Sequence, residues 1–198
     1  MKKIQQIILA FMLGIVPLQS AWAVSKADEL VEAASNGDLE QVKTLIEKEG
    51  IDINARETEY EIGETALISA STGGQLEVVK YLISKGADIN IKDNDGVTAL
   101  MMASAKGHLE VVKYLIDNGA DINAKASVDT TSLMVASFYG HLEVVKYLIG
   151  KGADVNVVAK IDEKMLPNST TALDFAKIDA IKEVLKNAGA KSAKEIKK

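Results

Sequence analysis

The chain has 198 residues and no cysteine, and its 28 acidic and 23 basic side chains give a formal net charge of −5. The acidic excess argues against nucleic acid as the main partner, because duplex binding depends on Lys and Arg side chains that neutralise phosphates. The lack of cysteine excludes disulfides and thiol chemistry, so a continuous apolar core must stabilise the fold.

The first 23 residues have the pattern of a secretory signal peptide. Lys2 and Lys3 precede an apolar run at 7–16, and Ala21-Trp22-Ala23 fits a small-x-small cleavage site. The run is too short to cross a hydrocarbon layer, which requires about 20 apolar residues. No cysteine follows it that could carry a lipid anchor.

We therefore expect cleavage after Ala23 and no membrane attachment of the mature chain 24–198. Its 21 basic and 28 acidic side chains give it a formal charge of −7. The expected location is the bacterial periplasm, with secretion from the cell as the alternative.

Residues 25–62 predict a first pair of helices. Ser25, with Asp28 three residues later, is typical of a helix N-cap. Gly37 separates the two stretches of apolar periodicity, and charged and amide side chains are interspersed among the apolar ones. A polar outer face is what the first unit of a finite stack requires, so we expect an N-terminal cap here.

Three units of fixed length follow. The segments 107–116 and 140–149 share the sequence Gly-His-Leu-Glu-Val-Val-Lys-Tyr-Leu-Ile, and 74–83 differs only by Gln75 in place of His. The 33-residue period predicts a solenoid of stacked repeats. Every unit must satisfy the same packing, so structural residues repeat and functional residues are expected where the copies disagree.

Each unit predicts a helix, a tight turn and a second helix. A threonine stands where a helix N-terminus needs a side-chain oxygen, and a glycine nine residues later favours the left-handed backbone that ends a helix. On the second helix, one apolar stripe recurs at helical spacing. In the third unit these residues are Thr98, Gly107, Leu109, Val112, Leu115 and Ile116, and the other helix-starting threonines are Thr65, Thr131 and Thr171.

The segments Gly-Ala-Asp-Ile-Asn at 86–90 and 119–123, and Gly-Ala-Asp-Val-Asn at 152–156, predict turns that carry the chain into a projecting finger. The last unit begins at Thr171, seven residues later than the period requires. In that unit Ile181, Val184 and Leu185 continue the apolar stripe while charged residues face water, as expected for a C-terminal cap.

This pattern of Thr-x-Leu-x-x-Ala starts, Gly-His or Gly-Gln pivots and Gly-Ala-Asp-x-Asn exits resembles the ankyrin-repeat family. The resemblance implies an all-α solenoid of antiparallel helix pairs with projecting β-turn fingers. We expect five units, including two caps, at about 25–62, 63–95, 96–128, 129–168 and 169–191, followed by a basic tail at 192–198 with a solvated helix end. The family's Pro and His after the Thr are missing, for example at Ala99 and Met101, so the fingers are expected to be less rigid.

The copies disagree just before the pivot glycine, at positions that face the concave groove in ankyrin-like proteins. Small or polar residues occupy these positions in the early units, whereas two adjacent aromatic rings occupy them in the fourth unit. Exposed rings bury much area at low entropy cost, so they are candidate binding anchors. As an alternative, Phe138 packs against the final unit and leaves only Tyr139 exposed. The groove candidates are Thr72, Ala105, Lys106, Phe138 and Tyr139.

The family resemblance also implies partner contacts at finger-tip positions, namely Lys92, Asn94, Asp95, Val97, Lys125, Ser127, Val128 and Thr130. The first finger is longer than the repeat requires and carries Glu57, Glu59, Tyr60, Glu61 and Glu64. Like charges would extend it, and it would recognise a basic patch or remain solvated. The longer segment between Asn156 and Thr171 contains Met165, Leu166 and Pro167 and is also a candidate surface loop.

Three short patterns are interpreted as structural or accidental. His108 and His141 occupy the same position of the repeat, which indicates packing rather than metal binding or catalysis. The segment 93–96, Asp-Asn-Asp-Gly, lacks the twelfth-position Glu of a calcium loop and fits a finger turn. Asn168-Ser169-Thr170 matches a glycosylation pattern that arises easily by chance.

These features favour a non-enzymatic module that binds a folded protein, without cofactor, metal or catalytic residues, and as a monomer. Two alternatives remain open. One is a periplasmic inhibitor or immunity protein of a toxic enzyme, and the other is a secreted effector that binds a host protein.

Overall fold

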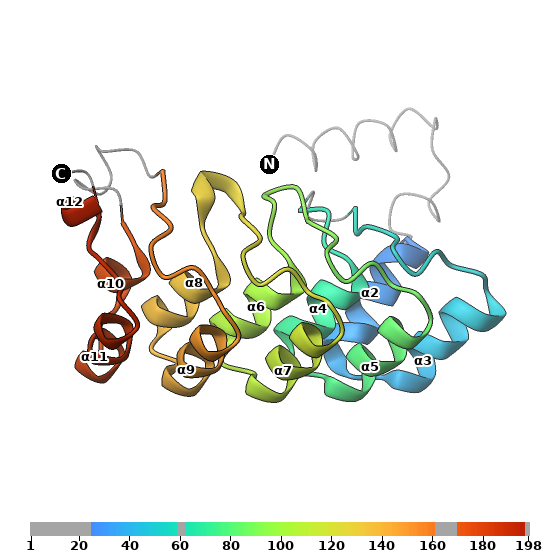
Figure 1. Cartoon of the computed structure of the whole chain (residues 1–198). Coiled ribbons are helices and arrows are strands. Elements are labelled where there is room, and N and C mark those ends of the chain that lie inside the picture. Colours follow the sequence, from blue (N-terminus) through green and yellow to red (C-terminus); the bar gives the residue numbers. More distant parts are fainter. Residues whose placement is uncertain (1–24, 59–61, 161–169, 197–198) are drawn as a thin grey trace, which may run out of the picture.

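The computed structural model describes residues 25–58, 62–160 and 170–196, and these form a row of helix pairs stacked in chain order (Figure 1). The predicted signal peptide, residues 59–61 of the first finger and most of the segment before the last unit lie outside the described residues. The described part contains no β-strand, only two isolated bridges, Arg56↔Thr65 and Ala159↔Thr170. The predicted all-α solenoid is confirmed.

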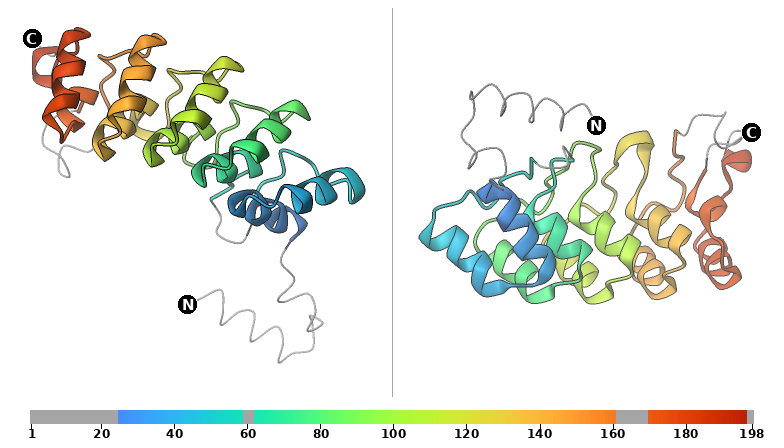
Figure 2. Two further views of the ribbon diagram at one scale, coloured as in Figure 1. Left: turned by 90° about the horizontal axis from the view of Figure 1, so that it is seen from below. Right: turned by 180° about the vertical axis from the view of Figure 1, so that it is seen from behind.

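The helices form two rows. The first helix of each pair contacts the first helices of its neighbours, and the second helices contact one another. Figure 2 shows both rows and the fingers that project beyond one edge. The first row is α2 (Lys26–Asn36), α4 (Ala66–Thr72), α6 (Ala99–Lys106), α8 (Ser132–Tyr139) and α10 (Ala172–Phe175). The second row is α3 (Leu39–Lys43) with the π-helical turn η1 (Thr44–Lys48), α5 (Leu76–Ser84), α7 (Leu109–Asp117), α9 (Leu142–Gly150) and α11 (Asp179–Asn187).

The predicted helix starts are confirmed. Ser25 and Asp28 form a capping box at α2 in which each side chain accepts a bond from the backbone of the other. At α6, the Thr98 hydroxyl accepts a bond from the Met101 N–H at 3.3 Å. The same bond forms at the start of α4, α8 and α10, from Thr65, Thr131 and Thr171.

The pivot glycines and the residues after them join neighbouring units. Gly107 has φ 76°, the left-handed backbone that ends α6, and the His141 ring of the next unit packs against it. His141 Nε2 lies 2.9 Å from the carbonyl oxygen of Ala105, and His108 Nε2 lies 3.0 Å from that of Thr72. Both histidines therefore serve the packing between units, as expected.

The core runs through all five pairs without interruption. Leu82, Leu115, Leu148 and Leu185 are fully buried, one in each second helix from α5 to α11. In α7 the predicted stripe needs one correction. Val111 is buried beside Val112, whereas Leu109 and Ile116 are only half-buried and pack at the edge of the core.

The three Gly-Ala-Asp-x-Asn exits, together with the equivalent Gly-Ile-Asp-Ile-Asn segment at 50–54, do more than turn the chain. Each asparagine side-chain oxygen accepts a hydrogen bond from a backbone N–H one unit further on, at 2.8–2.9 Å. The pairs are Asn54 with Asp88, Asn90 with Asp121, Asn123 with Asp154, and Asn156 with Lys191. A ladder of hydrogen bonds from asparagine side chains thus joins the units along the base of the fingers. A typical bond of this kind contributes about 1 kcal/mol to folding stability.

The expected solvated tail is partly anchored. The four-residue helix α12 (Ala193–Ile196) begins at a buried Ala193, whose N–H donates to Asp174 Oδ2 at 2.8 Å. The Thr171 hydroxyl also donates to the carbonyl of Lys191 at 2.9 Å. The start of the tail therefore packs onto α10, and the unit boundaries given above remain predictions.

Candidate functional site

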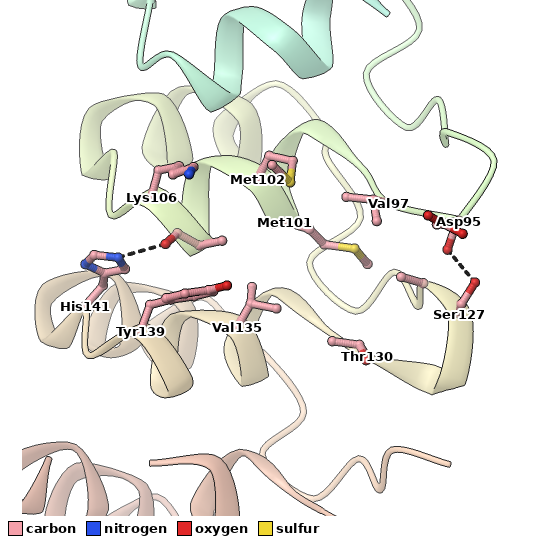
Figure 3. A pocket seen from close by; sticks show the side chains of 12 residues that line it. Asp95, Val97, Met101, Met102, Lys106, Ser127, Thr130, Val135, Tyr139 and His141 are labelled. Carbon is pink, nitrogen blue, oxygen red and sulfur yellow. Dashed lines mark hydrogen bonds between the residues drawn. The ribbon is translucent and has the colours of Figure 1, made fainter. Parts of the chain in front are cut away.

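A cavity of about 530 Å³ opens between the third and fourth units, bounded by α6, α8 and their two fingers (Figure 3). We call the surface formed by the first-row helices and the fingers the groove. The cavity is lined by Asp95, Val97, Met101, Met102, Ala105, Lys106, Ala126, Ser127, Thr130, Val135, Tyr139 and His141. Its size is within the range of small-ligand pockets, and it is large enough for a bulky side chain of a partner protein.

The cavity has an apolar centre and charged ends. Figure 3 shows Met101, Met102 and Val135 at its middle, with Lys106 at one end and Asp95 at the other. Tyr139 lies on the side formed by α8 and is 60% exposed, the largest exposed fraction among the large apolar side chains of the described residues. An apolar side chain fits the middle, and polar groups fit the ends.

A second, smaller cavity of about 170 Å³ lies between α8 and α10. It is lined by Thr130, Met134, Val135, Phe138, Tyr139 and Phe175. Thr130, Val135 and Tyr139 line both cavities, so they form a ridge that separates the two.

Phe138 packs against the final unit, as the alternative interpretation expected. Its ring meets Phe175 edge to face with centroids 5.9 Å apart, and Lys177 Nζ lies 3.7 Å from its centroid. The Tyr139 ring also meets the Phe138 ring edge to face, with centroids 5.1 Å apart. Phe138 is half-buried, so Tyr139 offers the larger free surface.

The structure gathers part of the predicted set. The main cavity brings together Ala105, Lys106 and Tyr139 from the helices and Asp95, Val97, Ser127 and Thr130 from the fingers. Phe138 lines the second cavity. Thr72, Lys92, Asn94, Lys125 and Val128 line neither of the two, and Glu59, Tyr60 and Glu61 lie outside the described residues. Whether any of these residues meets a partner remains a prediction.

Residues at one repeat position were missed. Ser69, Met102, Val135 and Phe175 are equivalent in the four later units, and the last three line the cavities. Their differences between copies were a usable signal, because binding residues are expected where the units disagree. Met101, Ala126 and His141 were also missed as lining residues.

Several finger residues are engaged with the neighbouring finger. The Ser127 N–H and hydroxyl both donate to the carbonyl of Asp95, at 2.8 and 2.7 Å. Lys92 Nζ donates to the carbonyl of Lys125 at 2.9 Å. Contacts of this kind hold the fingers to one another and fix the rim of the main cavity.

The tip of the third finger, between α7 and α8, has an unusual backbone. Val128 and Asp129 have φ of 58° and 59°, and Val128 is 48% exposed. A β-branched residue at positive φ is strained and persists only where its surroundings hold it. Here Lys160 does so, since its N–H donates to the Val128 carbonyl at 2.7 Å and its Nζ pairs with Asp129 at 2.9 Å.

The acidic first finger departs from expectation. Glu57 is buried, and its Oε1 accepts bonds from the N–H groups of Ile62 and Gly63 at 2.8 and 3.0 Å. Glu64 is half-buried. Both carboxylates therefore belong to the interior of the finger, and charge repulsion does not extend its base. Only Glu59 and Glu61 remain candidates for recognising a basic patch.

Glu64 gives the protein a predicted pH dependence. Burial raises the pKa of its carboxyl, Asp93 and Glu57 raise it further, and a hydrogen bond with Ser69 opposes the rise. At pH values between the pKa of about 4.3 in the unfolded chain and the higher pKa in the folded chain, the folded state binds more protons than the unfolded state. The free energy of unfolding therefore falls as the pH rises through this window. We expect Glu64→Gln to unfold at a higher urea concentration than wild type at pH 7 and at a similar one near pH 4. The exposed Glu110→Gln should keep the wild-type pH profile, and identical profiles for wild type and Glu64→Gln would contradict the assignment.

The segment 93–96 is a finger turn, as expected. Asp93 Oδ1 accepts bonds from the N–H groups of Asp95 and Val97 at 2.9 and 2.8 Å. This carboxylate closes the turn through the backbone. Within the described ranges, no group of three or more His, Asp or Glu side chains is arranged to hold a metal ion.

The same described part of the chain holds no helix with both the length and the apolar character needed to cross a bilayer.

Comparison with protein families gives two matches. A family model for ankyrin repeats in three copies matches residues 30–126, and a model for a single ankyrin repeat matches residues 129–160.

The chain matches short segments of several curated relatives. The chain is 42% identical over 65 residues to alpha-latrocrustotoxin-Lt1a of Latrodectus tredecimguttatus, which is 33% of this chain and 4% of the toxin. It is 44% identical over 63 residues to palmitoyltransferase akr1 of Schizosaccharomyces pombe, or 32% of this chain and 9% of the enzyme. It is 43% identical over 70 residues to ankyrin repeat and SAM domain-containing protein 6 of Rattus norvegicus, or 35% and 8%. The chain thus covers less than a tenth of the length of each of these relatives.

Proposed function

Because the chain belongs to the ankyrin-repeat family, we propose that it is an exported, non-enzymatic module that holds a folded protein partner in its groove. Ankyrin repeats generally mediate protein–protein interaction and are generally non-catalytic, although some relatives, such as the palmitoyltransferase, are enzymes with ankyrin regions. The finer parts of the proposal are the site on the groove and the export.

One observation carries the site. Tyr139, 60% exposed, stands between a 530 Å³ cavity and a 170 Å³ cavity on the groove. A tyrosine in this place offers a large, rigid surface and a hydroxyl at low cost in entropy, which is typical of residues that dominate binding energy. A partner side chain in either cavity would cover the ring.

The site is tested by capture from periplasmic extract. A photo-crosslinking residue at position 139 is expected to capture one defined protein, and Tyr139→Ala is expected to weaken its binding by about 2 kcal/mol or more, roughly 30-fold. The matched control is Tyr114→Ala, since Tyr114 lies on the second-row helix α7 and lines neither groove cavity. Equal recovery with wild type and Tyr139→Ala would remove Tyr139 from the site.

The export proposal rests on the charged start, apolar run and Ala21-Trp22-Ala23 of the sequence. It has a separate test. Fractionation of the producing cells is expected to place the protein in the periplasm. Its intact mass is expected to match a chain that begins at Val24. Recovery from the culture medium would support the secreted alternative, and a cytoplasmic chain that retains residues 1–23 would contradict export.

A further inference from the structure

Resting on the proposed function, we infer that the groove between α6 and α10 recognises an acidic, apolar peptide segment of its partner. A large apolar side chain of that segment fills the 530 Å³ cavity, and neighbouring carboxylates pair with Lys106 and Lys177, which lie on either side of Tyr139.

The cavity itself selects an apolar side chain of adaptable shape. Met101 and Met102 supply unbranched, polarisable walls, and Val97 and Val135 complete the apolar lining. Methionine repacks around different apolar shapes, so the volume suits a large aliphatic or aromatic side chain. The exposed ring of Tyr139 is positioned to cover it.

Exposed lysines without an ion-pair partner among the described residues gather around the two cavities. Lys106, Lys125 and Lys177 are exposed and make no ion pair with any described residue. Asp129 is already paired with Lys160 at 2.9 Å. Asp95 is the remaining exposed carboxylate that lines the main cavity. Around the two cavities, the exposed Lys106 and Lys177 thus face one exposed lining carboxylate, Asp95, while the exposed Asp174 of α10 is held by the N–H groups of Thr171 and Ala193.

Lysines of the second-row helices form ion pairs within their own helix. Lys80, Lys113 and Lys146 each pair with the glutamate three residues earlier, at 2.7–2.8 Å. Lys106 and Lys125 have no acid three residues earlier. Asp174 does stand three residues before Lys177, but its carboxylate accepts hydrogen bonds from the N–H groups of Thr171 and Ala193 and forms no ion pair with Lys177. Their charges remain available to carboxylates of a partner, which complementary potentials would steer and orient.

The two ends of the cavity fix the direction of the bound segment. Lys106 and Asp95 lie at opposite ends in Figure 3. A carboxylate is attracted at the Lys106 end and repelled at the finger end, where Asp95 lies. Lys177, with its Nζ over the Phe138 ring, offers a second cation beyond Tyr139. The acidic residues of the segment should therefore run along the pivot side of the groove.

The inference is tested with three short synthetic peptides that share a Phe-Leu centre and are flanked by Glu, Gln or Lys. Binding to the purified chain is measured by fluorescence polarisation at two salt concentrations. The Glu peptide is expected to bind about 10-fold more tightly than the Gln peptide, with the Lys peptide weakest and the difference reduced at high salt. Equal affinities, a preference for the Lys peptide, or no binding by any of the three would overturn it.

Variants locate the effect. Lys106→Glu with Lys177→Glu is expected to reverse the preference toward the Lys peptide, whereas Lys146→Glu, on the second-row helix α9, leaves it unchanged. An unchanged preference in the double variant would contradict the proposed site. If the Lys106→Glu and Lys177→Glu double variant binds the partner captured through position 139 as tightly as wild type does, the proposed binding function stands. Only the proposed preference for an acidic segment is then wrong. If position 139 captures nothing, the function itself fails.

Discussion

Replacing Leu115 by alanine is expected to lower the free energy of unfolding by about 2–5 kcal/mol, because the change removes a fully buried side chain and leaves a cavity. Leu115 lies in α7, the second helix of the central unit, and the shared core passes through it. Neighbouring units stabilise one another in a solenoid, so the loss should lower the stability of the whole stack. Urea unfolding followed by circular dichroism measures it.

Leu109→Ala is the matched control. Leu109 belongs to the same helix and loses the same atoms, but it is half-buried at the edge of the core. Its loss should be clearly smaller than that of Leu115→Ala. Similar losses for the two variants would mean that the core does not run through the centre of α7 as described.

A second large effect is expected at a pivot. Gly107→Ala should cost about 2–4 kcal/mol, the sum of two causes. Gly107 has φ 76°, where alanine is strained, and a Cβ there would clash with Nδ1 of the His141 ring. The ring cannot withdraw freely, because its Nε2 is bonded to the carbonyl of Ala105 at 2.9 Å.

Gly119→Ala separates the two causes. Gly119 also has positive φ, at 95°, but a Cβ there meets nothing within 4 Å. It should therefore cost only the backbone strain, about 1 kcal/mol. The difference between the two variants, measured by thermal unfolding, reports the contact between units. Equal losses of stability in Gly107→Ala and Gly119→Ala would show that the His141 ring can move away from the added methyl group without a cost in free energy.

Local and periodic features were predictable from the sequence. Thr98 caps α6 and Gly107 ends it because both residues act on backbone within three or four positions. The structural role of His141 followed from its recurrence in register with the repeat, and Leu115 was assigned to the core by helical periodicity. Near-identical units make such inferences secure, because each copy repeats the same requirement.

The features that were missed depend on contacts between units. The sequence predicted Glu57 to be one of the acidic residues of an extended finger. In the structure its carboxylate is buried and accepts hydrogen bonds from the N–H groups of Ile62 and Gly63. Met102 and Val135 form a cavity wall only once α6 lies beside α8.

The architecture follows from the amino-acid sequence, since a 33-residue period with fixed caps and pivots buries the shared apolar stripe by stacking the units. The arrangement of the groove surface depends on how the units pack. This packing turned Phe138 toward Phe175, left Tyr139 exposed and set Lys106 and Lys177 on either side without acidic partners among the described residues. The physical reason is that side chains at varied positions take their neighbours from adjacent units, and the repeat does not specify which residues those neighbours are.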